Sequence, residues 1–229
     1  MAIAGIFTEA RAQQQPLLDP ANAIAFNEFF RLLVPPEDVE ERANLFTDWQ
    51  QGAVFLSQGR FASDITFNYD VLNNTLLVQV DEKKYSLNPI AVDSILVANR
   101  AQVLINPIIL EGIGSDLLLL RLYNGLHLSL FRNNLAAVID SDNRTSSIAE
   151  IKYTGDSDVR IALEQKYLLL NKDTNELREV LGKKKELKKW ENGDQILTFI
   201  KNQNLDFSNE DDLIQVVQYY EQLNYGDID

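Results

Sequence analysis

Short apolar runs separated by polar clusters fill the middle of the chain, from residue 52 to about residue 182. Runs rich in Val, Ile, Leu, Tyr and Phe alternate with clusters of Asn, Asp and Gly, which is typical of antiparallel strands joined by short turns. Helical crossovers between the runs are absent, so the pattern argues against a parallel sheet. The expected strands are 54–56, 65–70, 75–80, 84–87, 94–97, 103–110, 117–123, 126–131, 150–153, 159–163, 166–170 and 177–181, with turns at 72–74 and 81–83.

One hairpin is predicted in detail, within residues 117–131. Asn124-Gly125 is the pair that a two-residue type I′ turn favours, because both turn positions need a positive φ. Such a turn places Tyr123 opposite Leu126, and both faces of the hairpin are apolar. We therefore expect it to be covered on both sides, either centrally in a sandwich or barrel or with one face lining an apolar cavity. The predicted ligand-binding or core face consists of Leu118, Leu120, Leu122, His127 and Phe131.

The N-terminal segment, residues 13–51, is expected to form an arm or helices. Residues 21–33 are rich in Ala, Phe and Leu, an acidic-led stretch covers 37–51, and Pro35-Pro36 marks a boundary between them. The alternative is an extended arm that packs its phenylalanine rings on a neighbouring sheet.

The C-terminal segment, residues 183–229, predicts a helical cap. Apolar residues recur at helical spacing from Ile196 onward, and Ser208 with Asp211 resembles a capping box before a second apolar stripe. The whole chain is thus predicted to be mainly β with α. Its body is an antiparallel β-sandwich or open barrel of meander topology over 52–182, capped by two C-terminal helices.

Composition limits the classes of function. The chain has 229 residues, 45% of them hydrophobic, and a net charge of −13, so we expect no nucleic-acid partner. It has no cysteine and a single histidine, which removes thiol catalysis, thiolate metal sites and any site that needs two imidazoles. No cofactor and no metal are predicted. No apolar run approaches the roughly 20 residues of a transmembrane helix, so the chain is not expected to span a membrane.

The start of the chain resembles an export signal. Residues 2–7 are apolar, and Ala10-Arg11-Ala12 has the small-x-small form of a signal-peptidase site. Residues 1–12 are accordingly predicted to be the remnant of a signal peptide, with a mature chain that begins near Gln13. A periplasmic or extracellular location follows, and a cytoplasmic protein with a polar terminus is the alternative.

Few polar side chains indicate chemistry. His127 is expected in mid-strand, and no Gly-x-Ser-x-Gly elbow surrounds the neighbouring Ser129, so a structural histidine is favoured over a catalytic one. Two acidic loops offer oxygen ligands for Ca²⁺, but their spacing is not that of an EF-hand, and surface turns are favoured. The aspartates of these loops are Asp140, Asp142, Asp156 and Asp158.

The two tryptophans are candidate interaction residues. Trp49 precedes the first strand, where its ring would either stack on a sugar or pack the N-terminal arm against the sheet. Trp190 ends the basic run 183–189, which is expected to be a solvated connector or to dock on the acidic C-terminal segment.

A wider pattern adds a resemblance. Trp49 and Gly52 precede an apolar strand and Gly59, and they are followed by Asn68-Tyr69-Asp70, Leu76-Leu77-Val78, Leu122-Tyr123-Asn124-Gly125 and a Tyr-rich terminal helix. From about residue 46 to residue 224 the chain resembles exported proteins of unknown function found in Bacteroidota. The resemblance implies an envelope or extracellular setting and no assigned chemistry.

The predicted function is a non-enzymatic envelope or secreted protein that binds a protein partner or structural element through its β surface. The alternative is a carrier of a lipid or another apolar ligand, held in a cavity under the C-terminal helices. A hydrolase that uses two carboxylates comes third, because no spacing selects a pair of acids.

Overall fold

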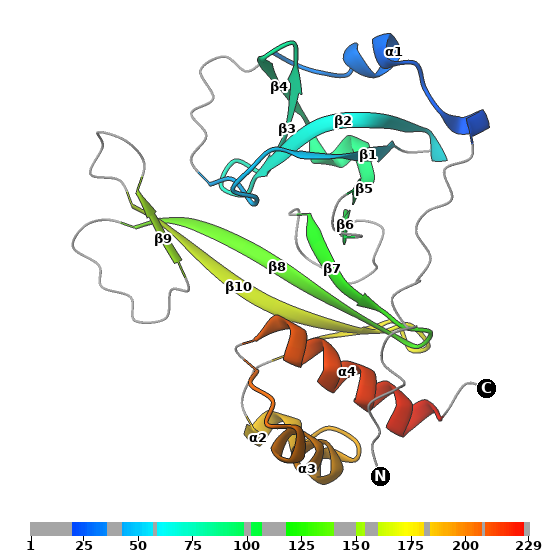
Figure 1. Cartoon of the computed structure of the whole chain (residues 1–229), viewed down its shortest axis with the longest axis vertical. Coiled ribbons are helices and arrows are strands. Elements are labelled where there is room, and N and C mark those ends of the chain that lie inside the picture. Colours follow the sequence, from blue (N-terminus) through cyan, green and yellow to red (C-terminus); the bar gives the residue numbers. More distant parts are fainter. Residues whose placement is uncertain are drawn as a thin grey trace.

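The computed structural model of the chain describes residues 20–35, 43–56, 59–98, 102–106, 118–139, 150–153, 160–180, 184–207 and 209–226. Its strands β1 to β4 lie in one part of the molecule, beneath the short helix α1 (Figure 1). The long strands β8 and β10 lie in the other part, with helices α2, α3 and α4 on one side (Figure 1).

Eleven strands of the described residues form one sheet in the order β11-β10-β8-β7-β6-β5-β1-β2-β3-β4, with β9 paired to β10. All pairs between these strands are antiparallel, which confirms the predicted fold class, and the sheet does not close. The strands are β1 Gln50–Leu56, β2 Phe61–Asp70, β3 Thr75–Val80, β4 Lys83–Leu87, β5 Val92–Val97, β6 Gln102–Ile105, β7 Leu119–Asn124, β8 Leu128–Ile139, β9 Glu150–Tyr153, β10 Arg160–Asn171 and β11 Glu176–Glu179.

Two strand predictions are wrong in extent. The strand expected over 126–131 begins at Leu128 and continues to Ile139 as β8. The runs 159–163 and 166–170 are not two strands, because β10 is continuous and pairs with β8 along its whole length. Glu164 and Gln165 interrupt the apolar run, but neither is a turn-forming residue such as Gly, Pro, Asn or Asp, and both lie exposed within the strand. Most of the predicted strand 103–110 beyond β6 lies outside the described residues.

The described part of the N-terminal arm consists of short helical turns and bends, with isolated bridges to the sheet. It contains a 3-10 turn, η1 Pro20–Asn22, and one short helix, α1 Phe26–Phe30, so the expected helix over 21–33 is limited to five residues. Val34 forms two backbone hydrogen bonds with Ser86 of the edge strand β4, and Phe29 is fully buried. Within 37–51 the described residues 43–49 form no helix. An arm packed on the sheet is therefore the better description.

Strands in the middle of the sheet are buried on both faces. In β1, Val54 and Leu56 belong to an apolar cluster that also contains Phe29, whereas Ala53 and Phe55 belong to a second cluster. Because successive side chains of a strand point to opposite faces, the two clusters lie on opposite sides of the sheet. The β7 region shows the same alternation, as a central strand with two covered faces requires.

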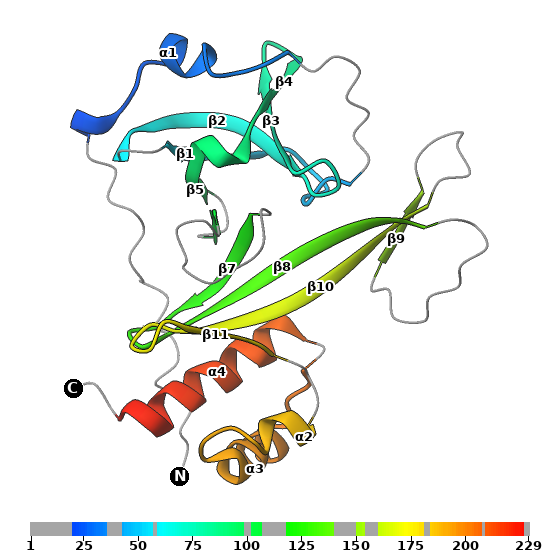
Figure 2. The ribbon, with the colours of Figure 1, turned by 180° about the vertical axis from the view of Figure 1, so that it is seen from behind.

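A helical cap covers one face of β8, β10 and β11 (Figure 2). It consists of α2 Lys184–Leu187, α3 Gly193–Gln203 and α4 Glu210–Tyr225. The side chain of Asn209 caps α4 by accepting hydrogen bonds from the backbone N–H groups of Asp211 and Asp212. The predicted cap, Ser208, lies outside the described residues. The described structure thus contains the two expected helices and the short α2 in addition.

Candidate functional site

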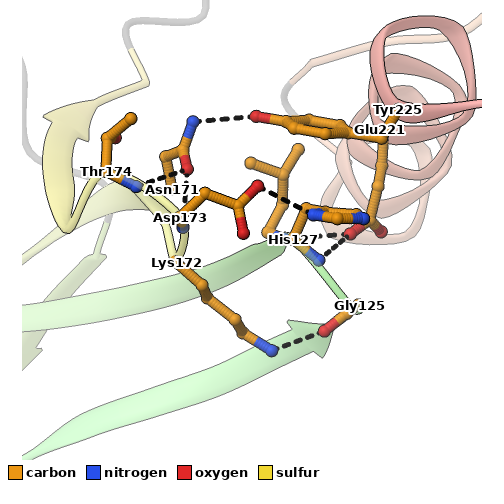
Figure 3. A network of polar contacts seen from close by, with 9 residues as sticks. Gly125, His127, Asn171, Lys172, Asp173, Thr174, Glu221 and Tyr225 are labelled. Atoms are coloured by element: carbon orange, nitrogen blue, oxygen red, sulfur yellow. Dashed lines mark hydrogen bonds and ion pairs between the residues drawn. The ribbon is translucent and has the colours of Figure 1, made fainter.

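A polar network joins the β7–β8 turn, the β10–β11 turn and helix α4 (Figure 3). Its centre is the carboxylate of Glu221, a residue only 7% exposed. Glu221 Oε1 accepts hydrogen bonds from the backbone N–H groups of His127 at 2.6 Å and Leu128 at 2.9 Å. Glu221 Oε2 accepts one from the hydroxyl of Tyr123. One side chain of the helix thereby satisfies three donors of the hairpin.

Lys172 completes the contact from the neighbouring turn. Its ammonium donates to the backbone carbonyl of Gly125 at 2.5 Å and to Asn124 Oδ1 at 2.9 Å. In an ordinary tight turn the carbonyl of the first residue accepts from the N–H of the fourth. Here the N–H of Leu128 donates to Glu221 instead, and Lys172 donates to the Gly125 carbonyl. An acid and a base from distant segments thus take the place of the Leu128-to-Gly125 bond, while the N–H of Gly125 still donates to the Leu128 carbonyl at 2.8 Å.

A second layer of contacts surrounds the ring of His127 (Figure 3). The imidazole stacks on Tyr225, with ring centroids 4.3 Å apart and an angle of 5° between the rings. Its Nδ1 lies 2.8 Å from Asp173 Oδ2. The side chain of Asn171 donates to the Tyr225 hydroxyl at 2.8 Å and accepts from the backbone N–H of Asp173 at 2.9 Å. Both turns are thus fixed to the end of α4.

The electrostatics fit a structural role for the network. Burial raises the pKa of Tyr123, and its hydrogen bond to the Glu221 carboxylate raises it further. Tyr123 therefore keeps its proton and remains a donor. Burial lowers the pKa of Lys172, while the nearby Glu221 carboxylate acts in the opposite direction.

The carboxylate at the centre of the network and the nearby serine hydroxyl are both engaged in hydrogen bonds. The three donors engage both oxygens of Glu221, and the hydroxyl of Ser129 donates to Asn124 Oδ1 at 2.9 Å, away from His127. Over the described ranges, no group of three or more His, Asp and Glu side chains could hold a metal ion. The acidic loops that include Asp140 and Asp156 lie outside these ranges. What the network does chemically is to hold two turns against a helix.

The predicted type of turn at Asn124-Gly125 is wrong. Neither residue has a positive φ, and Tyr123 pairs with Leu130, so residues 125–127 form the loop. Glycine is needed at 125 for another reason, since a Cβ there would lie 1.9 Å from Glu221 Oε2. A two-residue turn with two positive φ angles does occur, at Asp81-Glu82 between β3 and β4.

The longer loop also changes the predicted strand face. Leu118 and Leu120 are buried in one cluster, and Leu122 is partly buried against it. Phe131 lies in the cluster on the opposite face, because a shift of one residue moves every β8 side chain to the other side of the sheet. His127 lies in the turn, where the prediction had placed it in mid-strand.

The two tryptophans occupy different environments. Trp190 packs against the cluster under the helical cap, with the guanidinium of Arg178 4.1 Å from its ring centroid and the ring of Tyr220 at 4.9 Å. It therefore joins the segment before α3 to the sheet. Trp49 is partly buried, and the ammonium of Lys84 lies 6.0 Å from its ring centroid.

A group of exposed apolar side chains lies on the N-terminal arm beside β4. We define the arm patch as Phe26, Phe30, Val34 and Tyr85. Phe26 is 50% exposed and Val34 is 61% exposed. The ring of Phe30 lies 6.2 Å from that of Phe26 and 5.0 Å from that of Tyr85, measured between centroids. Val34 extends the patch along β4 through its pairing with Ser86.

Comparisons with protein-family profiles, with curated proteins and with solved structures found no match to this chain. The resemblance to exported Bacteroidota proteins therefore stays a prediction. A search of the described helices found none that combines the length and the apolar character needed to cross a membrane.

Proposed function

We propose that the protein is a non-enzymatic binding protein whose arm patch recognises another protein. The observation that carries this proposal is the exposure of Phe26, Phe30 and Val34 next to an edge strand. Exposed and contiguous apolar side chains on a folded domain are typical of interaction surfaces, and aromatic rings contribute strongly to them.

The surroundings of the arm patch favour a protein over a membrane surface. Glu28 and Arg60 form an exposed ion pair beside α1, with 3.0 Å between Arg60 Nη1 and Glu28 Oε1. A polar rim around an apolar centre is the usual anatomy of a protein interface. The net charge of −13 also opposes adsorption to anionic lipid.

The other two predicted functions have less support. Leu128, Leu130, Val216 and Val217 are all buried in one cluster between the sheet and the helical cap, which leaves less reason to propose a lipid cavity there. The hydrolase needs two carboxylates aimed at one space, and the buried carboxylate of Glu221 is already occupied by three donors.

The test combines identification of a partner with direct binding. Proteins cross-linked to the chain in its native cells would be identified, purified and titrated against the full chain. The double variant Phe26→Ser/Phe30→Ser should weaken binding about tenfold or more, because central aromatic side chains dominate interfaces. Leu126→Ser is the matched control, since Leu126 is 62% exposed in a distant turn. Equal affinity of all three proteins for every partner would contradict the proposal.

We further propose an envelope or extracellular location, supported by the signal-peptidase-like sequence Ala10-Arg11-Ala12. N-terminal sequencing of the native protein tests this directly. The expected chain begins near Gln13 and is recovered outside the cytoplasm. A native chain that begins at Met1 and is found in the cytosol would contradict it.

A further inference from the structure

A groove between helices α3 and α4 lies outside both the polar network and the arm patch. Its volume is about 390 Å³, which falls in the range of small-ligand sites. Two rows of α3 side chains, spaced by one helical turn, form most of its lining together with one ring from α4. The lining residues are Asp194, Gln195, Thr198, Phe199, Asn202, Gln203 and Tyr219.

The two aromatic rings of the groove are not explained by the core. Phe199 and Tyr219 stack on each other with ring centroids 4.0 Å apart and an angle of 7° between the rings. Both are partly exposed, and neither packs against the apolar cluster that joins the helices to the sheet. The buried side of α3 is instead formed by Ile196 and Ile200. Because the two rings stack on each other, their inner faces are covered, and each ring leaves its outer face and edges to line the groove.

Most polar side chains of the groove face solvent, and within the described part of the chain only Thr198 among the uncharged ones is bonded, through its hydroxyl to the Asp194 carbonyl at 2.8 Å. Gln195, Asn202 and Gln203 make no side-chain hydrogen bond there, and neither does the Tyr219 hydroxyl. Each amide offers donors and acceptors together, and so does a hydroxyl. Asp194 is the only charged residue of the lining, so the groove has no cation for a phosphate or carboxylate.

We propose that this groove binds a neutral saccharide. A sugar ring combines an apolar C–H face, which fits the outer face of an aromatic ring, with hydroxyl groups that donate hydrogen bonds to side-chain amides and accept them. The lining extends over two turns of α3, about 12 Å, which suits a short oligosaccharide better than a single ring. A peptide fits less well, because the groove presents neither a strand edge nor a row of apolar pockets.

The experiment is a glycan microarray probed with the full chain, followed by calorimetric titration of the best neutral oligosaccharide. Phe199→Ala and Asn202→Ala should each weaken binding about tenfold, the effect expected from losing one aromatic contact or one pair of hydrogen bonds. Gln222→Ala is the matched control, because Gln222 is exposed on α4 and does not line the groove. Unchanged circular dichroism establishes that each variant is folded.

The outcomes are distinct from those of the arm-patch test. Saccharide binding that is lost in the groove variants and kept in Phe26→Ser/Phe30→Ser supports this inference. It would be overturned by an array without any bound neutral glycan, by binding that the groove variants leave unchanged, or by a peptide that binds the groove in place of sugars.

Discussion

Two hairpin turns of the same sheet are formed by different means. The β3–β4 turn depends on its own residues, because Asp81 and Glu82 both adopt positive φ angles and allow strands to pair directly on either side. The β7–β8 turn has no positive φ at Asn124 or Gly125. Besides one local bond, from the N–H of Gly125 to the Leu128 carbonyl, its backbone groups bond to Glu221, which lies 94 residues beyond His127, and to Lys172.

This difference extends to the two parts of the molecule. Around β1 to β6, apolar side chains from the arm and the strands fill the core, and short turns join β2 to β3 and β3 to β4. Around β7 to β11, an apolar cluster is supplemented by charged contacts between segments that are far apart in sequence. The C-terminal turns should therefore depend on docking of α4, whereas the β3–β4 turn should not.

The largest effect is expected at Gly52, in the N-terminal part. A Cβ at this position would lie 2.0 Å from the backbone carbonyl oxygen of Leu96, and a paired strand cannot move away easily. Gly52→Ala should lower the free energy of unfolding by about 4 kcal/mol, measured by urea denaturation. Gly59→Ala is the control, because Gly59 has a positive φ of 72° but no atom within 4 Å of a new Cβ. If Gly52→Ala and Gly59→Ala lower the free energy of unfolding equally, close packing against the neighbouring strand is not what requires glycine at position 52.

The next effect concerns the polar network. Glu221→Ala removes the acceptor for two backbone N–H groups and the Tyr123 hydroxyl, and should cost about 3 kcal/mol. Hydrogen exchange at His127 and Leu128 should accelerate more than exchange in the β3–β4 hairpin. Gln222→Ala is the matched control, because Gln222 is the exposed neighbour of Glu221. It should change neither the free energy of unfolding nor the exchange rates appreciably. Slow exchange retained at both amides in Glu221→Ala would show that the turn forms without the helix.

A smaller effect is expected at high pH. Burial raises the pKa of Tyr69 to about 12, and its hydroxyl donates to Asn74 Oδ1 at 2.6 Å. An unfolded tyrosine loses its proton near pH 10, so between pH 10 and 12 the folded chain holds the extra proton. Stability should therefore be complete below pH 10 and fall by about 2 kcal/mol as the pH approaches 12. Tyr69→Phe should remove that part of the decline. If the free energy of unfolding falls with pH between 10 and 12 equally steeply in both proteins, Tyr69 is not the group responsible.

The smallest effect separates the two turns. Glu82 has a φ of 65°, a conformation that costs energy for any residue with a Cβ, so Glu82→Gly should stabilise the protein by about 0.5 kcal/mol. Asn124→Gly should not stabilise it, because Asn124 lacks a positive φ and its side chain accepts bonds from Ser129 and Lys172. Thermal denaturation of the two variants checks both statements. Stabilisation by Asn124→Gly would mean that this turn too is set locally.

Local patterns in the sequence predict the strands but not their long-range connections. Most strands follow from apolar runs between turn residues, because pairing and burial both depend on local alternation. The joining of 159–163 and 166–170 into β10 was missed, since two polar residues resemble a break although β8 pairs across them. The arm, too, follows contacts with β4 more than its own helix propensity.

The polar network could not be predicted from local signals. Asn124-Gly125 marks the position of a turn, but its type depends on a carboxylate from the last helix. One signal was available, because Glu221 follows Val217 by four residues and so lies on the apolar face of α4. An acidic residue on such a face needs a buried partner, although the sequence does not say which one.

A double-mutant cycle between Gly125 and Glu221 tests most directly whether helix α4 sets the conformation of the β7–β8 turn. In the native protein, Gly125→Ala should cost about 2 kcal/mol, because its Cβ would displace the Glu221 carboxylate from its three donors. In the Glu221→Ala background the same substitution should cost less than about 0.5 kcal/mol, since the clashing group is absent. An equal cost of Gly125→Ala in both backgrounds would contradict the account.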